Sequence, residues 1–124
     1  MKQRLADVDG VTNAAVLAFD AARSNSDFPE GKPVGVSRWM SQTGGGQPVG
    51  PPELSITVLD EYHGIGVGTR LMDDLLALAR QRGLHRIHAD VLRENVPMRA
   101  LINRYRAVVQ PSGDPAVVRY RLDV

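Results

Sequence analysis

The chain has 124 residues, which suits one small domain, residues 1–124, with a single hydrophobic core. Hydrophobic residues make up 43% of it and aromatic residues only 5%, so we expect a core of aliphatic side chains in a sheet covered by helices. The formal net charge of +1, with scattered arginines, gives little support to nucleic-acid binding, and the absence of cysteine excludes disulfides, thiolate metal sites and a cysteine nucleophile.

The start of the chain shows no pattern of a targeting signal. Residues 1–7 lack the apolar core of a signal peptide, and no apolar run in the chain approaches the length of a membrane span. We therefore expect a soluble, cytoplasmic protein without a membrane partner.

Two strands are expected in the first third of the chain. Residues 14–20 form an apolar run and residues 33–40 alternate between apolar and polar side chains, so we expect the two to pair as a hairpin. Their polar connection, residues 21–32, is long for a hairpin loop and should be mobile. Residues 43–52 are rich in glycine and proline, cannot continue a strand, and predict a flexible surface loop.

A strand, a helix and another strand follow. Residues 53–60 alternate and are β-branched in the centre, which predicts a strand. Residues 69–82 place leucines on one helical face, and Gly83 follows as a stop signal. Residues 84–92 predict the next strand. A strand-helix-strand crossover of this kind implies one parallel pair of strands.

The last part of the chain predicts a second helix and a hairpin. Asn95 suits the N-cap of a helix that begins near Pro97 and places Met98 and Tyr105 on its apolar face. Residues 107–110 and 116–124 predict two strands joined by a turn rich in proline and glycine. The element order therefore predicts a mixed α/β (α+β) fold with a mostly antiparallel sheet.

Between the strand at residues 53–60 and the first helix lies the sequence Tyr-His-Gly-Ile-Gly-Val-Gly-Thr, residues 62–69. Glycine at every second position lets the backbone turn sharply and exposes its N–H groups, and the helix adds its partial positive end. The pattern predicts a phosphate-binding loop, although a structural turn also selects glycine. Gly68-Thr69 lacks the lysine of a P-loop, and the preceding antiparallel strands disfavour a dinucleotide-binding fold.

Together these features resemble the GNAT superfamily of acyl-CoA-dependent N-acyltransferases. The run His63-Gly64-Ile65-Gly66-Val67-Gly68 is similar to the family signature Gln/Arg-x-x-Gly-x-Gly/Ala. The resemblance covers roughly residues 14–124, because family-like segments follow in family order at residues 33–36, 53–58, 82–84 and 90–99. The segment 94–105 also resembles the catalytic domain of mycobacterial-type protein lysine acetyltransferases.

The resemblance implies acetyl-CoA as the acyl donor, an amine such as protein lysine as the acceptor, and no metal. It implies a GNAT-like sheet with helices on both faces. The glycine run would bind the pyrophosphate of coenzyme A, the strand before it would pair with the pantetheine arm, and Asn95 would contact that arm while also capping its helix. The implied cofactor-binding residues are Ile56, Thr57, Val58, His63, Gly64, Ile65, Gly66, Val67, Gly68, Thr69 and Asn95.

Glu53 is the candidate catalytic residue. An amine with a pKa of about 10.4 is mostly protonated at neutral pH, so attack on a thioester requires a base. The resemblance places Glu53 where several lysine acetyltransferases of the superfamily carry a glutamate that acts directly or through water. The alternative is a solvated glutamate at the end of a strand.

The sequence departs from the family pattern at four places. The usual first strand and first two helices are missing or reduced to residues 1–13, which would leave the strand at residues 14–20 as a sheet edge and makes a homodimer that covers it a reasonable hypothesis. Ile65 replaces a residue that is often basic. Ile102 stands where the family has its general-acid tyrosine, with Tyr105 nearby on the packed face. Arg106 replaces the glycine that would take a left-handed conformation after the last helix.

Three functions follow from these observations. The first is acetyl-CoA-dependent N-acetyl transfer by direct attack, with Glu53 as the general base. The second is a CoA-binding module with little or no catalysis, favoured by the departures. The third is a structural or partner-binding domain. His85 and His88 have no clustered partners and are poor candidates for metal ligands, and Trp39 suits the core.

Overall fold

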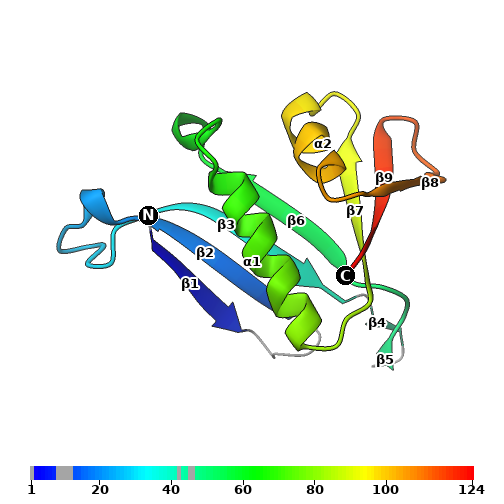
Figure 1. Cartoon of the computed structure of the whole chain (residues 1–124), viewed down its shortest axis with the longest axis horizontal. Helices are drawn as coiled ribbons and strands as arrows, with labels where there is room; N and C mark the ends of the chain where they lie inside the picture. The colour runs from blue at the N-terminus through cyan, green and yellow to red at the C-terminus, as the bar shows by residue number, and fades with distance from the viewer. Residues whose placement is uncertain (1, 8–12, 42, 45–46) are drawn as a thin grey trace.

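The computed structural model describes residues 2–7, 13–41, 43–44 and 47–124, and the side chains of residues 13–41 and 49–124. A seven-stranded mixed sheet of order β1-β2-β3-β6-β7-β9-β8 forms the body of the molecule, with α1 lying across β2, β3 and β6 (Figure 1). The strands of this sheet are β1 (Lys2–Asp7), β2 (Asn13–Asp20), β3 (Lys32–Met40), β6 (Glu53–Val58), β7 (Arg86–Leu92), β8 (Val108–Gln110) and β9 (Val117–Asp123). The helices are α1 (Val67–Gln81) and α2 (Val96–Asn103), with 3-10 turns at Ala21–Arg23 and Asp60–Tyr62.

The N-terminal end of the sheet differs from the expectation. β1 pairs with β2 along its whole length, from Lys2 opposite Phe19 to Asp7 opposite Ala14. A strand therefore does precede residue 14, so the first strand is not missing but lies within residues 1–13. The expectation that β2 is a sheet edge is wrong, and the stated reason for a homodimer is removed. The sequence of β1 carries no alternating pattern that would mark a strand, and its backbone pairs with β2 all the same.

The two loops expected before β6 contain local structure. In the connection between β2 and β3, the Asn25 carboxamide accepts hydrogen bonds from the N–H groups of Asp27 and Phe28 at 2.9 and 2.8 Å. In the glycine- and proline-rich segment, β4 (Thr43–Gly44) and β5 (Gln47–Pro48) form a separate two-stranded ladder. This ladder corrects the prediction of a flexible surface loop that cannot form a strand, because two-residue strands need no apolar alternation to pair.

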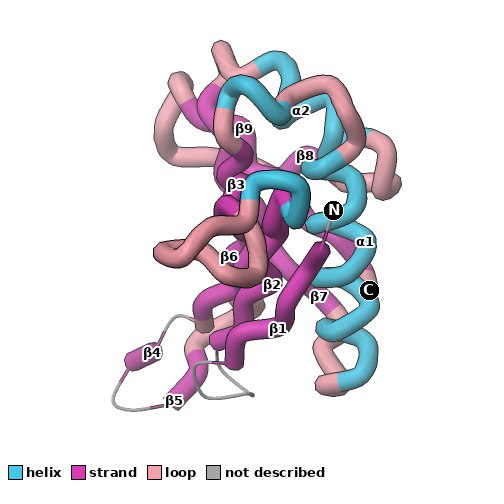
Figure 2. Tube along the Cα trace, turned by 90° about the vertical axis from the view of Figure 1, so that its left-hand side faces the viewer, coloured by secondary structure: helices cyan, strands magenta, loops and turns pink. Residues whose placement is uncertain are grey.

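Both described helices lie on one face of the sheet. The Ser37 hydroxyl donates to the carbonyl of Leu71 in α1 at 3.1 Å, and cross-strand pairing puts Ser37 on the same face as Ile56. Glu53 pairs with His88, so by alternation Ala89 of β7 lies on the same face as Ile56, and Ala89 pairs with Tyr120 of β9. The Tyr120 hydroxyl accepts a hydrogen bond from Arg99 of α2, which places α2 on this face too. Figure 2 shows α1 to one side of the strands. The expectation of helices on both faces is therefore wrong for the described residues.

The core lies between this face and the helices. Trp39, Leu71, Leu75, Ile87 and Tyr120 are among its fully buried side chains, and burial of such side chains contributes about 1.5–3 kcal/mol each. Most of the buried hydrophobic side chains are aliphatic, which agrees with the composition, although Trp39 and Tyr120 are the two largest of the fully buried ones. Within the described part of the chain, no helix has the length and apolar character that a bilayer span requires.

The expected parallel pair is present, and it is very short. β6 and β7 share one bridge, Glu53 opposite His88, and the His88 N–H donates to the Pro52 carbonyl at 2.9 Å. Beyond this point the ladder stops, although both strands continue for several residues. The two strands therefore diverge toward the start of α1 and leave a gap in the middle of the sheet.

Candidate functional site

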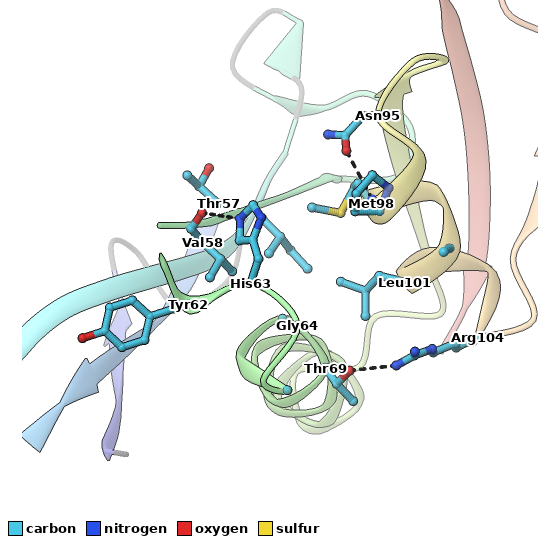
Figure 3. A pocket seen from close by; sticks show the side chains of 15 residues that line it. Thr57, Val58, Tyr62, His63, Gly64, Thr69, Asn95, Met98, Leu101 and Arg104 are labelled. Atoms are coloured by element: carbon cyan, nitrogen blue, oxygen red, sulfur yellow. Dashed lines mark hydrogen bonds between the residues drawn. The ribbon is translucent and has the colours of Figure 1, made fainter. Parts of the chain in front are cut away.

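A cavity of about 590 Å³ lies between the end of β6, the loop after it and the facing sides of α1 and α2 (Figure 3). β6 contributes its last three residues, and the glycine-rich loop and the first turn of α1 form a second wall. α2 forms the third wall. The lining residues are Ile56, Thr57, Val58, Tyr62, His63, Gly64, Gly66, Gly68, Thr69, Asn95, Pro97, Met98, Ala100, Leu101 and Arg104.

The start of α1 is built to face this cavity. Gly64 and Gly66 have φ angles of +75° and +90°, left-handed values that a side chain would strain. Gly66 is the N-cap of α1, and no side chain caps the helix there. The N–H groups of the first turn have no acceptor within the helix, and the helix dipole adds partial positive charge. The loop is therefore suited to a phosphate or another anion.

Two hydrogen bonds hold the loop in place. The Tyr62 hydroxyl donates to the Asp20 carboxylate on β2 at 2.6 Å, an interaction that raises the pKa of Tyr62 and lowers that of Asp20. The His63 ring nitrogen Nε2 lies 2.8 Å from the Val58 carbonyl oxygen, so the imidazole folds back over the end of β6 (Figure 3). These contacts fix the loop from both sides before any ligand arrives.

A second cavity, of about 210 Å³, occupies the gap between β6 and β7. Ile56, Asn95 and Met98 line both cavities, so the two adjoin. Ser55 and Asp90 also line the second cavity, and strand alternation places them on the sheet face opposite the helices. The gap therefore leads from the start of α1 through the sheet toward its other face.

Glu53 lies beside this gap and lines neither cavity. It starts β6 on the face opposite the helices, where its Oε1 accepts a hydrogen bond from Arg119 of β9 at 2.8 Å. The same guanidinium binds both carboxylate oxygens of Asp90 at 2.8 and 2.9 Å and lowers the pKa of Asp90. Burial, with the charges of Arg119 and Arg86, lowers the pKa of His88 beside them.

The structure brings most of the predicted cofactor-binding residues together around the larger cavity. Two do not line it: Ile65 is 63% exposed at the tip of the loop, and Val67 is 3% exposed in the core. Asn95 lines both cavities and also caps α2, because its side chain accepts a hydrogen bond from the Met98 N–H at 3.2 Å. The two roles expected for Asn95 are thus sterically compatible.

Tyr105 is turned away from both cavities. Its hydroxyl donates to the Asp73 carboxylate at 2.7 Å and lies 3.1 Å from the Thr69 carbonyl, and burial together with Asp73 raises its pKa. A phenol held in this way is a poor proton donor to a leaving group. Ile102, at the family's tyrosine position, is buried in the core.

Several lining residues were not predicted as site residues. Tyr62 precedes the glycine run, and Pro97, Met98, Ala100, Leu101 and Arg104 belong to α2 or its end. The helical spacing of Met98 and Leu101 marks an apolar face without saying whether a core or a ligand covers it. In the described part of the chain, no group of three or more acidic or histidine side chains is placed to hold a metal ion.

Comparison with known proteins gives a consistent result. The model of the acetyltransferase (GNAT) family matches residues 16–106. Acetyltransferase Pat of Mycolicibacterium smegmatis is 41% identical over 56 residues, which are 45% of this chain and 17% of the relative. The GNAT domain of S. lividans PAT is 25% identical with a TM-score of 0.79, over 95% of this chain and 64% of that one. The fold is also similar to that of yncA from Salmonella typhimurium, solved with its cofactor acetyl-CoA (16% identity, TM-score 0.69, over 90% of this chain and 64% of that one). This chain thus spans a small part of the curated relative.

Proposed function

This chain belongs to the GNAT family of acetyltransferases, and we propose that it transfers an acetyl group from acetyl-CoA to an amine, with a protein lysine as the acceptor class. The observation that carries the proposal is the pair of adjoining cavities, which connects an anion-binding helix start with a gap in the sheet. A diphosphate joined to a long, narrow arm that ends in a thioester has the shape of this path.

The residues present fit coenzyme A. The uncapped first turn of α1 offers N–H groups to the pyrophosphate, and Gly64 and Gly66 leave open space where side chains would stand. β6 has no ladder to β7 beyond Glu53, which supports the proposal that the backbone groups of residues 56–58 would pair with the amide groups of a pantetheine arm. Asn95, at the junction of the two cavities, would contact the same arm.

Acetyl-CoA, when bound, supplies a thioester carbonyl that an amine can attack. Glu53 is proposed to accept the proton of the amine, directly or through a water molecule. Its position on the face opposite the helices means that the amine would approach from that face, while the CoA phosphates stay at α1. Arg119 donates a hydrogen bond to this carboxylate and orients it beside the gap.

A protein lysine suits this approach for two reasons. The described helices leave the acceptor face of the sheet uncovered, so a large molecule can reach the gap. The segment 94–105 also resembles the catalytic domains of protein lysine acetyltransferases. A small amine remains an outcome of the test below.

A second function is favoured by one observation. The family's tyrosine position holds Ile102, and the nearby Tyr105 does not line either cavity. Neither residue is therefore proposed to protonate the leaving thiolate. A CoA-binding module with little catalysis is therefore the competing proposal.

Titration calorimetry with acetyl-CoA, followed by thiol release in the presence of lysine peptides and small amines, separates the two. Binding with amine-dependent thiol release supports the transferase. Binding of acetyl-CoA without thiol release with any of the amines supports the CoA-binding module. Absence of acetyl-CoA binding overturns both the transferase and the module. Mass spectrometry of the peptide then shows whether the acetyl group is on lysine.

A further inference from the structure

Arg104, which directly follows α2, is a cation at the larger cavity. Among the described residues that line this cavity it is the one with a permanent charge. The Nε2 of His63, the other basic residue there, lies 2.8 Å from the Val58 carbonyl oxygen. The phosphate-binding loop itself has Ile65 at its exposed tip. Positive charge therefore reaches the cavity from the side of α2.

The guanidinium of Arg104 is placed at the start of α1. Its Nη1 donates to the Thr69 hydroxyl at 3.3 Å, a contact drawn in Figure 3. Thr69 is the third residue of α1, so its N–H belongs to the first turn, which lacks acceptors within the helix. Arginine has five N–H donors in a planar fork that matches the oxygens of a phosphate.

The surrounding residues leave this charge available. Asp73, the nearby carboxylate on α1, accepts its hydrogen bond from Tyr105 at 2.7 Å. No ion pair joins Arg104 to a carboxylate within the described residues for which side chains are placed. A phosphate between Arg104 and the first turn of α1 would neutralise a guanidinium that the protein itself leaves unpaired.

We propose that Arg104 binds the pyrophosphate of coenzyme A from α2, opposite the backbone N–H groups of α1. This inference rests on the proposed function, since it assigns a residue to the same ligand. Arg104 is a binding residue with no part in proton transfer. The glycine run alone leaves the phosphate site open on the side of α2, and Arg104 closes it there.

The test is calorimetric titration of wild type, Arg104→Gln and Arg70→Gln with CoA and with dephospho-CoA, which lacks the 3′-phosphate. Arg70 is a matched control, because it lies exposed in the first turn of α1 and does not line the cavity. Loss of a partly exposed charged hydrogen bond predicts about tenfold weaker binding of both ligands by Arg104→Gln. Arg70→Gln is expected to stay within about twofold of wild type, because its charge lies outside the cavity and is screened.

Each alternative result has a defined meaning. If wild type binds neither ligand, the proposed function fails; if wild type binds and Arg104→Gln binds equally well, only the present inference fails. Weakening with CoA alone would assign Arg104 to the 3′-phosphate and overturn the pyrophosphate assignment. As a second measurement, the ratio of the dissociation constant of Arg104→Gln to that of wild type must shrink as the salt concentration is raised. A ratio unchanged by salt would indicate a structural defect and also overturn the proposal.

Discussion

Replacing Glu53 by glutamine should separate catalysis from cofactor binding. At a pH of about 7.5 an amine with a pKa of about 10.4 is neutral in only about one molecule in 800. A positioned base that removes the proton contributes about 100-fold or more to the rate. Because Glu53 lines neither cavity, the variant should keep its affinity for acetyl-CoA. We therefore expect kcat to fall about 100-fold while KM for acetyl-CoA changes less than about twofold.

The assay is thiol release with a lysine peptide, measured across pH. Without the base the variant depends on amine that is already neutral, so its rate should rise about tenfold for each pH unit toward the amine pKa. Wild type should rise less steeply, and the two should converge at high pH. Glu94→Gln is the matched control, because Glu94 is an exposed glutamate that lines neither cavity. Equal kcat for wild type and Glu53→Gln at neutral pH would refute the assignment, as would an equal loss in the control.

Three further outcomes follow from single contacts. Arg106 has a φ of +58°, a left-handed value that strains a residue with a side chain. Arg106→Gly should therefore raise the free energy of unfolding by about 1 kcal/mol, measured by urea titration with Trp39 fluorescence, and Arg106→Ala should not. Equal gains for the two variants would show that backbone strain is not the cause. Tyr105→Phe loses the bond to Asp73 and should cost about 1 kcal/mol of stability while leaving thiol release unchanged, and a tenfold slower release would restore Tyr105 as a general acid. Arg119 lowers the pKa of Asp90 below 3.8. The ion pair between them therefore stabilises the fold above that pH, and this stabilisation is lost as the pH falls through the lowered pKa of Asp90. Arg119→Gln should be less stable than wild type by about 0.5–1 kcal/mol at pH 7. That difference should vanish in acid unfolding, and a constant gap would contradict the linkage.

The order of the main elements could be predicted from local patterns. β3, β6 and α1 carry alternation or helical periodicity strong enough to mark them, and β2 is marked by its apolar run. The position of Asn95 shortly before Pro97 predicts an N-cap. Arg106 was identified as standing where a left-handed residue is needed, and the structure gives it that conformation. These predictions held because the physical cause lies within a few residues of the feature.

What the sequence could not predict depends on distant residues. β1 is a strand because it pairs with β2, and its own sequence has no signal for that pairing. Arg104 reaches the cavity only because α2 packs against the first turn of α1, where a Cβ at Gly68 would lie 3.1 Å from the Leu101 side chain. The link between Glu53 and Asp90 passes through Arg119, which is 66 residues from Glu53 along the chain. Tertiary contacts of this kind leave no local pattern.

The one-sided placement of the helices bears on how two substrates could meet. The glycine-rich loop opens on the helix face, while Glu53 and Asp90 lie on the other face, and the gap between β6 and β7 connects them. A donor that enters from α1 would present its acyl end in the gap without blocking the face from which an amine arrives. Both substrates can then be bound at once, so direct transfer needs no covalent enzyme intermediate.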